Sequence, residues 1–393
     1  MKKLAIFTPE VLPVPAVRGG AVEQLITYLI EGNELNHIYD IDLYTVDDSL
    51  LDNISYKYTN LIKIKKEKRF SLPHIVFAIF NRLLRKFGDR RHIEYINLKF
   101  MKAFKRDYYD SVLVENNMEL YNLLVKKKTN ERFYFHLHND FDNGDVDKTY
   151  TNTKEIIQTA DKIFVVSNFL KDKLLKLGAR NVEVVYNAID NSNLRNFDLY
   201  EIISVKKKLG IKNNQYVFTY IGRLDQKKGI DKFLAAFTKL DTTESGHYKC
   251  LVVGAAWNNP KFQRKLHKIE VSNKNIINIG YVPHNMIKEI FLVSDCIVIP
   301  TQIEEAFGEV ALEAMMMKKP IICSDSGALP EITSQNGTFI VKRGVDFEKK
   351  LAAAMYQLAT NRTLSINMGK ANFEKSKKYP MTASDYFYFF KDI

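Results

Sequence analysis

Long apolar segments are missing from this 393-residue sequence. No apolar run approaches the ~20 residues that a helix needs to cross a bilayer, and the longest candidates, such as Ile75–Phe80, are short. The basic start at Lys2 and Lys3 continues into Leu4–Phe7 but breaks at Thr8-Pro9-Glu10, which favours a first strand over a signal peptide. We therefore expect a cytoplasmic protein without a spanning helix.

Cysteine is also scarce. The chain has three, Cys250, Cys296 and Cys323, an odd number at wide spacing. This pattern argues against a disulfide framework and against a zinc site, and it is typical of reduced, buried thiols in the cytosol.

Acidic residues are few in one segment. The net charge of the chain is +12, and between Leu61 and Arg106 fourteen Lys or Arg face only three acidic residues, so this segment carries +11. A solvated charged face is the plain explanation of a charge run. Here the cations interleave with large apolar residues, which favours a basic amphipathic helix at an anionic membrane surface. The residues proposed for this membrane or acceptor surface are Phe80, Arg82, Arg85, Lys86 and Phe87. No nucleic-acid module accompanies the charge, so we expect no nucleic-acid partner.

Short apolar runs alternate with longer helical patterns along the whole chain, which predicts an α/β fold with parallel sheets. The expected strands of the first half are Lys3–Phe7, Ile41–Thr45, Ser111–Glu115, Phe133–Leu137, Lys162–Val166 and Val182–Tyr186. Those of the second half are Tyr216–Ile221, Lys249–Val253, Ile276–Ile279, Cys296–Ile299, Pro320–Cys323 and Gly337–Val341. We expect two facing, Rossmann-like, doubly wound domains with a cleft between them, one over residues 1–190 and one over 191–375. Residues 376–393 are expected to form a helix that packs back towards the first domain.

The strongest motif lies between Ile299 and Met315, where a strand ends, a loop carries Glu305, and Phe307-Gly308 opens a helix that contains Glu313. The amides at this helix start, from Phe307 through Glu309 to Val310, suit a diphosphate or sugar oxygens. Because Glu313 lies ~7.5 Å further along the helix axis than Gly308, it can hold a ribose while Glu305 reaches a donor sugar. An acidic first turn favoured by the helix dipole is the alternative explanation.

A second motif supports the first. The strand Tyr216–Ile221 runs into Gly222, Arg223 and then Lys228-Gly229, so one loop offers two cations to one anion. A leaving nucleoside diphosphate gains negative charge as the glycosidic bond breaks, and fixed cations stabilise that transition state more than the ground state.

Together these two segments resemble the signature of the GT-B fold glycosyltransferases of retaining family 4 (glycosyl transferases group 1). Other segments in matching order are Gly19-Gly20, Val165–Asn168, Val185–Asp190 and Ser326–Ile332, the last two with Ala188 and Ala328 in place of glycine. The resemblance spans most of the chain and is sharpest over residues 216–332. It implies an acceptor-binding first domain and a nucleotide-sugar-binding second domain, with Gly19, Gly20 and Val282 among the donor-site residues.

The resemblance also implies a retaining reaction without a metal, and therefore no cofactor. Three Asp-x-Asp pairs, at Asp40/Asp42, Asp140/Asp142 and Asp145/Asp147, resemble a metal motif of the other glycosyltransferase fold, but that motif is common by chance. His136 and His138 close a strand on the same face. The family places a His followed by a polar pair here, so His138 is assigned to sugar binding and charge stabilisation, alongside Glu305, Arg223 and Lys228.

These features predict transfer of a sugar, with UDP favoured as the nucleotide, to a lipid-linked or saccharide acceptor in bacterial surface polysaccharide synthesis. The protein would attach peripherally to the inner face of the cell membrane. A non-hydrolysing nucleotide-sugar epimerase and an inactive sugar-binding assembly subunit are the alternatives. A dinucleotide dehydrogenase is disfavoured because neither half shows Gly-x-Gly-x-x-Gly after its first strand. The sequence leaves the sugar, base, acceptor and linkage open.

Overall fold

The computed structural model describes residues 1–67, 75–77, 79, 81–82, 94–141, 146–189, 199–241, 246–256 and 259–393. The chain divides into two compact units. Unit 1 comprises Met1–Ala188 together with Pro380–Ile393, and unit 2 comprises Ile189–Tyr379.

Unit 1 is built on a seven-stranded sheet with the strand order β3-β2-β1-β4-β5-β6-β7, and every adjacent pair is parallel. Its strands are β1 (Lys2–Phe7), β2 (Tyr39–Val46), β3 (Thr59–Ile64), β4 (Ser111–Glu115), β5 (Arg132–Leu137), β6 (Lys162–Val165) and β7 (Val182–Val184). The strand order reverses between β1 and β4, which makes that point the switch of a doubly wound sheet.

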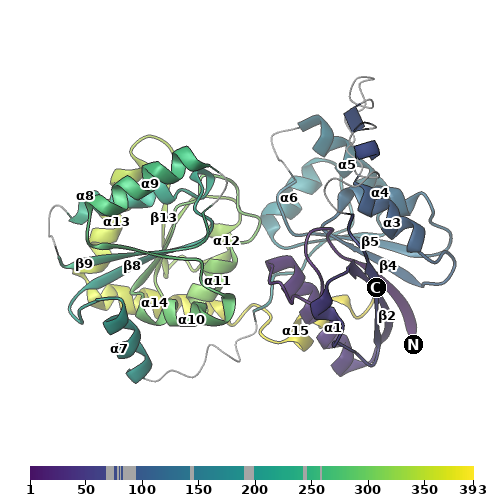
Figure 1. The fold of residues 1–393 in the computed structure, drawn as a ribbon, viewed down its shortest axis with the longest axis horizontal. Helices are drawn as coiled ribbons and strands as arrows, with labels where there is room; N and C mark the ends of the chain where they lie inside the picture. Colours follow the sequence, from purple (N-terminus) through teal and green to yellow (C-terminus); the bar gives the residue numbers. More distant parts are fainter. Residues whose placement is uncertain are drawn as a thin grey trace. The chain divides into compact units, whose positions relative to one another are not determined.

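Helices cover both faces of this sheet (Figure 1). The helices of unit 1 are α1 (Ala21–Asn36), α3 (Tyr95–Ala103), α4 (Met118–Val125), α5 (Val146–Thr159), α6 (Asn168–Lys176) and α15 (Ala383–Phe387). Successive side chains of β1 point to opposite faces of the sheet. Leu4 and Ile6 point to one face, where they join the buried cluster that contains Leu29 of α1. Phe7 points the other way and packs edge-to-face on Phe100 of α3, with ring centroids 6.1 Å apart.

The segment 380–393 completes the core of unit 1, although unit 2 precedes it in the chain. Tyr386, Phe387 and Phe390 belong to the same buried cluster as α1. The helices α1 and α15 touch at Gly32, where an added Cβ would lie 2.4 Å from the Cβ of Phe387. The hydroxyl of Tyr39 donates to the carbonyl of Phe390 over 3.1 Å.

Unit 2 is a six-stranded parallel sheet with the order β10-β9-β8-β11-β12-β13. Its strands are β8 (Tyr216–Ile221), β9 (Tyr248–Val253), β10 (Ile276–Gly280), β11 (Cys296–Ile299), β12 (Ile321–Ser324) and β13 (Thr338–Val341). The switch point lies between β8 and β11. The predicted pair of doubly wound sheets is therefore confirmed.

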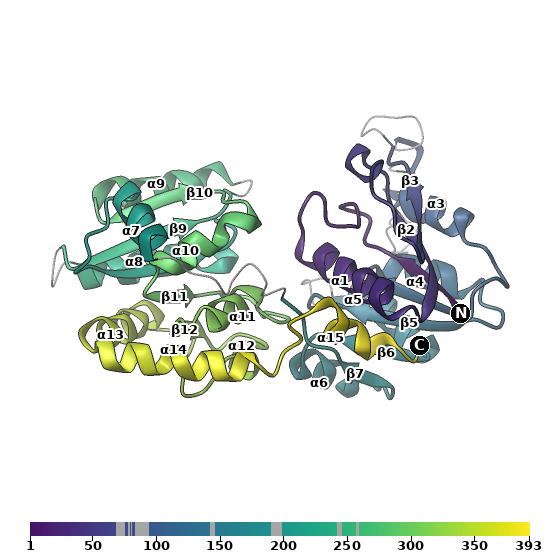
Figure 2. The same ribbon diagram turned by 90° about the horizontal axis from the view of Figure 1, so that it is seen from below.

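The helices of unit 2 are α7 (Leu199–Lys208), α8 (Ile230–Asp241), α9 (Pro260–Ser272), α10 (Ile287–Val293), α11 (Glu309–Met316), α12 (Leu329–Ile332), α13 (Phe347–Thr360) and α14 (Arg362–Ser376). Figures 1 and 2 show α8, α9 and α13 on one face of the sheet and α7, α10 and α11 on the other. Alternation along β8 explains this, since Phe218 packs with α8 and α13 while Val217 packs with Val205 of α7 and Val293 of α10. The three cysteines are buried free thiols, as expected.

One strand is absent from the sequence-based prediction. The edge strand β3 lies where only a basic segment is expected, and five of its six residues are only partly buried or exposed. An edge strand with one solvated face and Lys63 within it lacks the continuous apolar run that marks the central strands of a parallel sheet.

Candidate donor and sugar site

The predicted donor residues gather at the switch point of unit 2. Arg223 and Lys228 follow β8, and Glu305 follows β11, which pairs directly with β8. Ligands of doubly wound sheets bind outside the carboxyl ends of the strands at this point. Topology thus brings together two loops that are 77 residues apart, and the Nζ of Lys228 lies 2.6 Å from Oε1 of Glu305.

The loop after β8 holds its cations by local contacts. The side chain of Asp225 accepts from the backbone N–H of Lys228 over 3.0 Å. Gly229 has φ 72°, and a Cβ there would lie 1.9 Å from the carbonyl oxygen of Pro300, so the two loops can approach this closely only with glycine. The guanidinium of Arg223 is about half exposed and lies 3.9 Å from the Asp225 carboxylate.

Glu305 is fixed through its backbone as well as its side chain. Its N–H donates to the hydroxyl of Ser326 over 3.2 Å, and its carbonyl accepts from the N–H of Ala328 over 2.8 Å. Gly327 lies between them with φ 50°, and an added Cβ would be 2.2 Å from the Glu305 carbonyl oxygen. The loop between β12 and α12 therefore cradles Glu305.

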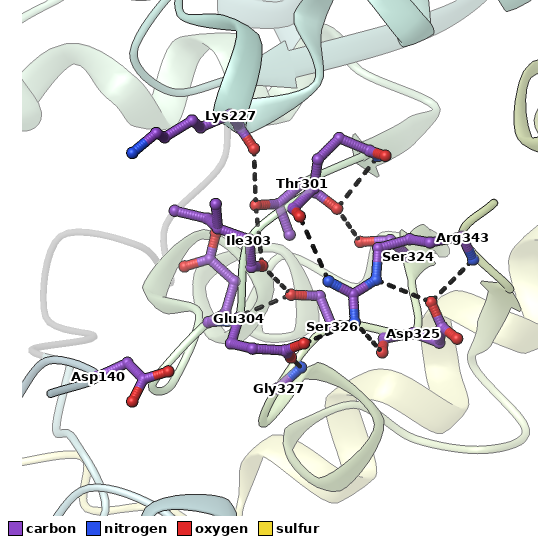
Figure 3. A network of polar contacts seen from close by, with 12 residues as sticks. Asp140, Lys227, Thr301, Ile303, Glu304, Ser324, Asp325, Ser326, Gly327 and Arg343 are labelled. Atoms are coloured by element: carbon purple, nitrogen blue, oxygen red, sulfur yellow. Dashed lines mark hydrogen bonds and ion pairs between the residues drawn. The ribbon is translucent and has the colours of Figure 1, made fainter. Parts of the chain in front are cut away.

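A polar network surrounds this cradle (Figure 3). Arg343 donates to the carboxylates of Glu304 and Asp325 over 2.8 and 3.1 Å. Glu304 also accepts from the N–H of Gly327, and Ser324 donates to the carbonyl of Thr301. The sequence-based interpretation includes none of these contacts, because they join loops that have no periodic pattern.

The helix α11 begins after Gly308, whose φ of 104° is unfavourable for other residues. Glu313 is 8% exposed, and its Oε1 lies 3.6 Å from Nδ1 of His284, a residue exposed in the turn two positions after Val282. Burial, reinforced by Glu309, raises the pKa of the Glu313 carboxyl to about 8. Glu313 is therefore no solvated surface residue. The side chain of Phe307 is buried against the ring of Tyr379, and Glu309 and Val310 form the first turn of α11.

In unit 1, His138 lies at the carboxyl end of β5, where it meets a carboxylate that the sequence-based interpretation missed. Its Nε2 lies 2.7 Å from Oε2 of Glu115, the last residue of β4, and Nδ1 of His136 lies 3.1 Å from the same oxygen. All three side chains are at most 2% exposed. A carboxylate that ends a buried strand beside β5 is the signal that could have identified Glu115.

Burial and the close contacts within this cluster shift the pKa values of Glu115 and His138. Burial alone would raise the pKa of Glu115, but the two imidazoles outweigh it and bring it to about 2. Burial and the neighbouring His136 lower the pKa of His138 to about 4. At neutral pH an ionised Glu115 therefore accepts from the Nε2–H of a neutral His138, which fixes the orientation of the ring.

Glu115, His136 and His138 are also the only group within the described ranges whose ligand atoms converge closely enough to hold a metal ion. Within this group, Nε2 of His138 is hydrogen-bonded to Glu115, whereas both ring nitrogens of the buried His136 and Nδ1 of His138 have no hydrogen-bond partner among the residues that the structure describes. Of the Asp-x-Asp residues, Asp42 accepts from Tyr109 and Lys105, and Asp140 pairs with Lys173. Asp142 and Asp145 lie outside the described residues.

The remaining predicted residues also lie in unit 1. Gly19 and Gly20 follow β1 and lead into α1 with φ of 75° and 101°. Arg82 is exposed, whereas Phe80, Arg85, Lys86 and Phe87 lie outside the described residues. A cavity of about 480 Å³ lies at the opposite, amino end of the sheet, lined in part by Asp40, Tyr56, Tyr58, Asn60 and Tyr108. Within the ranges that the structure covers, no helix is both long and apolar enough to cross a membrane.

This chain is similar to known glycosyltransferases in sequence, and similar to several solved structures in fold. Residues 202–375 match the family model described as glycosyl transferases group 1. The lipopolysaccharide 1,2-N-acetylglucosaminetransferase of Salmonella typhimurium is 28% identical over 67% of this chain and 74% of its own length. Sucrose-phosphate synthase from Thermosynechococcus elongatus superposes with a TM-score of 0.75 at 15% identity, over 100% of this chain and 98% of its own. HepE from Anabaena, in complex with UDP and glucose, superposes with a TM-score of 0.73 at 16% identity, over 99% of this chain and 98% of its own.

Proposed function

We propose that this chain, a glycosyltransferase of GT-B fold whose residues 202–375 belong to the glycosyl transferases group 1 family, transfers a sugar from a UDP-sugar with retention of configuration and without a metal. The sugar is transferred to a lipid-linked molecule or a saccharide during the synthesis of a bacterial surface polysaccharide. The observation that carries the proposal is the Lys228–Glu305 pair at the switch point of unit 2, with the buried Glu313 on the helix that follows. The Salmonella relative, named for lipopolysaccharide, and the HepE complex with UDP support the acceptor and the nucleotide.

The cations act on the leaving group. As the bond between the sugar C1 and the phosphate oxygen breaks, negative charge gathers on the diphosphate, where Arg223 and Lys228 stabilise it. The acceptor oxygen bonds to C1 on the face that the phosphate leaves, and its proton passes to the departing phosphate oxygen. No protein base is needed, so the neutral His138 serves to bind the donor sugar. Because two side-chain cations neutralise the diphosphate, a bound divalent ion is not needed for this role.

Glu305 and Glu313 have separate roles in this proposal. Glu305, held at the backbone and paired with Lys228, orients the donor sugar by accepting from its hydroxyl groups. Glu313 binds the ribose hydroxyls. A protonated Glu313 retains one acceptor oxygen and one donor, so it can still hydrogen-bond a diol.

Release of UDP is the direct test. The protein is first screened by thermal shift against a panel of UDP- and GDP-sugars, and the donor with the largest shift is then incubated with a lipid-linked acceptor. We expect acceptor-stimulated UDP release, an α-linked product from an α-linked donor by NMR, and a rate within about twofold after EDTA treatment. Interconversion of the nucleotide-sugar without UDP release would identify an epimerase. A thermal shift without either reaction would identify a binding subunit.

Attachment to anionic membranes is the second part of the proposal. Ile75, Val76 and Ile79 are 45%, 52% and 55% exposed, and Arg82 is exposed beside them. Apolar side chains in water next to cations suit an interface with anionic lipid, where each cation contributes ~1 kcal/mol. The assay is co-sedimentation with liposomes of varied anionic content. We expect binding that rises with anionic lipid, weakens with salt and is lost when Arg82, Arg85 and Lys86 are changed to Glu. Binding that survives this reversal would contradict the proposal.

A further inference from the structure

Arg343 connects three parts of unit 2 that meet around Glu305. It follows β13, and its guanidinium donates to Glu304 Oε1 over 2.8 Å, to Asp325 Oδ1 over 3.1 Å and to the carbonyl of Gln302 over 3.4 Å. Its own backbone N–H donates to Asp325 Oδ1 over 2.9 Å. Figure 3 shows the guanidinium between the two carboxylates. This single side chain therefore joins the end of β13 to the loop after β11 and to the loop after β12.

The two loops that Arg343 joins are those that hold Glu305. The loop after β12 supplies Ser326 and Ala328, which bond the N–H and the carbonyl of Glu305. Glu304, the direct neighbour of Glu305, receives the N–H of Gly327 on one carboxylate oxygen and the guanidinium of Arg343 on the other. A shift of either loop would therefore move the Glu305 backbone.

The chemistry of the contact requires arginine. A guanidinium has five N–H donors in a rigid plane, so it can serve two carboxylates and a carbonyl at once, whereas a lysine ammonium has neither the reach nor the fixed geometry. The network is also partly solvated, with Arg343 25% exposed, Glu304 39% and Asp325 33%. Ion pairs at such exposure contribute modestly to stability. The contacts of Arg343 are therefore expected to affect mainly the position of the two loops, and only modestly the stability of the unit.

We infer that Arg343 is a positioning residue that holds Glu305 in register with the donor sugar, an inference that rests on the proposed role of Glu305. A displacement of about 1 Å at a group that orients substrate can lower turnover by about 100-fold. Loss of the Arg343 fork therefore lowers kcat about 10- to 100-fold. Affinity for free UDP stays unchanged, because Glu313 lies on α11 and makes none of these contacts.

The experiment compares Arg343→Ala with a matched control, Lys342→Ala, which removes an exposed cation one residue earlier. UDP release is measured with the donor selected by thermal shift, and UDP affinity by calorimetry. We expect kcat to fall about 10- to 100-fold in Arg343→Ala with the Kd for UDP within about twofold, and no change in Lys342→Ala. In a Glu304→Ala background, the same Arg343→Ala change should cost less than it does in the wild type, because the shared contact is already lost.

A role in stability alone predicts a different pattern. Arg343→Ala would then weaken UDP binding and turnover in parallel, and its effect would be the same with and without Glu304. Either result, or a kcat within about twofold of wild type, overturns the inference. Should Arg343→Ala fail to fold, two milder variants replace it: Arg343→Lys, which keeps the charge but not the planar fork, and Glu304→Gln, which keeps the shape of the side chain but not its charge. Both are expected to show the same fall in kcat at unchanged UDP affinity. A wild-type protein that releases no UDP from any donor would instead refute the proposed function.

Discussion

The buried carboxyl of Glu313 makes the stability of unit 2 depend on pH. In the unfolded chain this group titrates near 4.5, and in the folded protein its pKa is about 8 because of burial and the nearby Glu309. Between these values the folded state keeps a proton that the unfolded chain has released. Stability should therefore be highest below pH 4.5 with respect to this group and fall as the pH rises to 8, by at most about 1.4 kcal/mol per pH unit.

The variant Glu313→Gln removes the ionisable group with little change in shape. We expect it to match the wild type within about 1 kcal/mol at pH 5 and to exceed its free energy of unfolding by up to about 4 kcal/mol at pH 8. Relaxation around the buried charge and the proximity of His284, 3.6 Å away, reduce this upper limit. The assay is urea unfolding followed by far-UV circular dichroism at pH 5, 6.5 and 8, with linear extrapolation to water.

The control for this comparison is Glu201→Gln, an exposed carboxylate in α7 of the same unit. It should follow the wild-type pH dependence. If the wild type and Glu313→Gln instead give parallel curves from pH 5 to 8, Glu313 ionises like a surface carboxyl, and the reasoning from its burial is wrong.

Three further predictions concern turnover and binding. Replacing Arg223 or Lys228 by Ala should lower turnover by about 10²- to 10³-fold with an unchanged circular dichroism spectrum, since each is proposed to stabilise the leaving diphosphate; near-normal turnover in both variants would rule out the assignment. Calorimetry should show that Glu313→Ala weakens the binding of free UDP while Glu305→Ala does not, and the opposite order would require the two roles to be exchanged. Gly327→Ala introduces a Cβ 2.2 Å from the Glu305 carbonyl oxygen, so we expect turnover to fall while UDP affinity is retained, and equal losses of both would show a general collapse of the unit.

Much of the fold is predictable because the central strands of a parallel sheet are buried on both faces. The bounds of β4, β8 and β11 agree with the prediction residue by residue. Each is short and mostly apolar, which is the pattern of strands that are buried on both faces of a parallel sheet. The edge strand β3 has no such run, and its pairing with β2 depends on contacts that are distant in sequence.

The candidate donor site is predictable to the extent that it follows from sheet topology. Motifs after two apolar runs indicate Lys228 and Glu305, and the rule for doubly wound sheets brings the ends of β8 and β11 together. The supports of Glu305 do not follow from any such rule. Ser326, Gly327 and Arg343 reach it from irregular loops, where the hydrogen bonds depend on the final three-dimensional placement.

The contact between His138 and Glu115 is partly predictable from the sequence. Both residues stand at the ends of predicted strands, and the register that places Glu115 beside His136 is that of an ordinary parallel pair. The sequence does not show which strands are neighbours, so the carboxylate could not be assigned to the histidine. The low pKa of His138 depends on burial, which is a property of the complete fold.

Unit 1 is built from two separate segments of the chain, and this affects the order in which the two units form during translation. Its core includes Tyr386, Phe387 and Phe390, which the ribosome adds only after every residue of unit 2. Until then the face of α1 around Gly32 remains uncovered, with its apolar side chains available to other nascent chains or to chaperones. Unit 2 is a continuous segment and can fold as soon as it emerges. Although it begins first, unit 1 is therefore expected to reach its native state last.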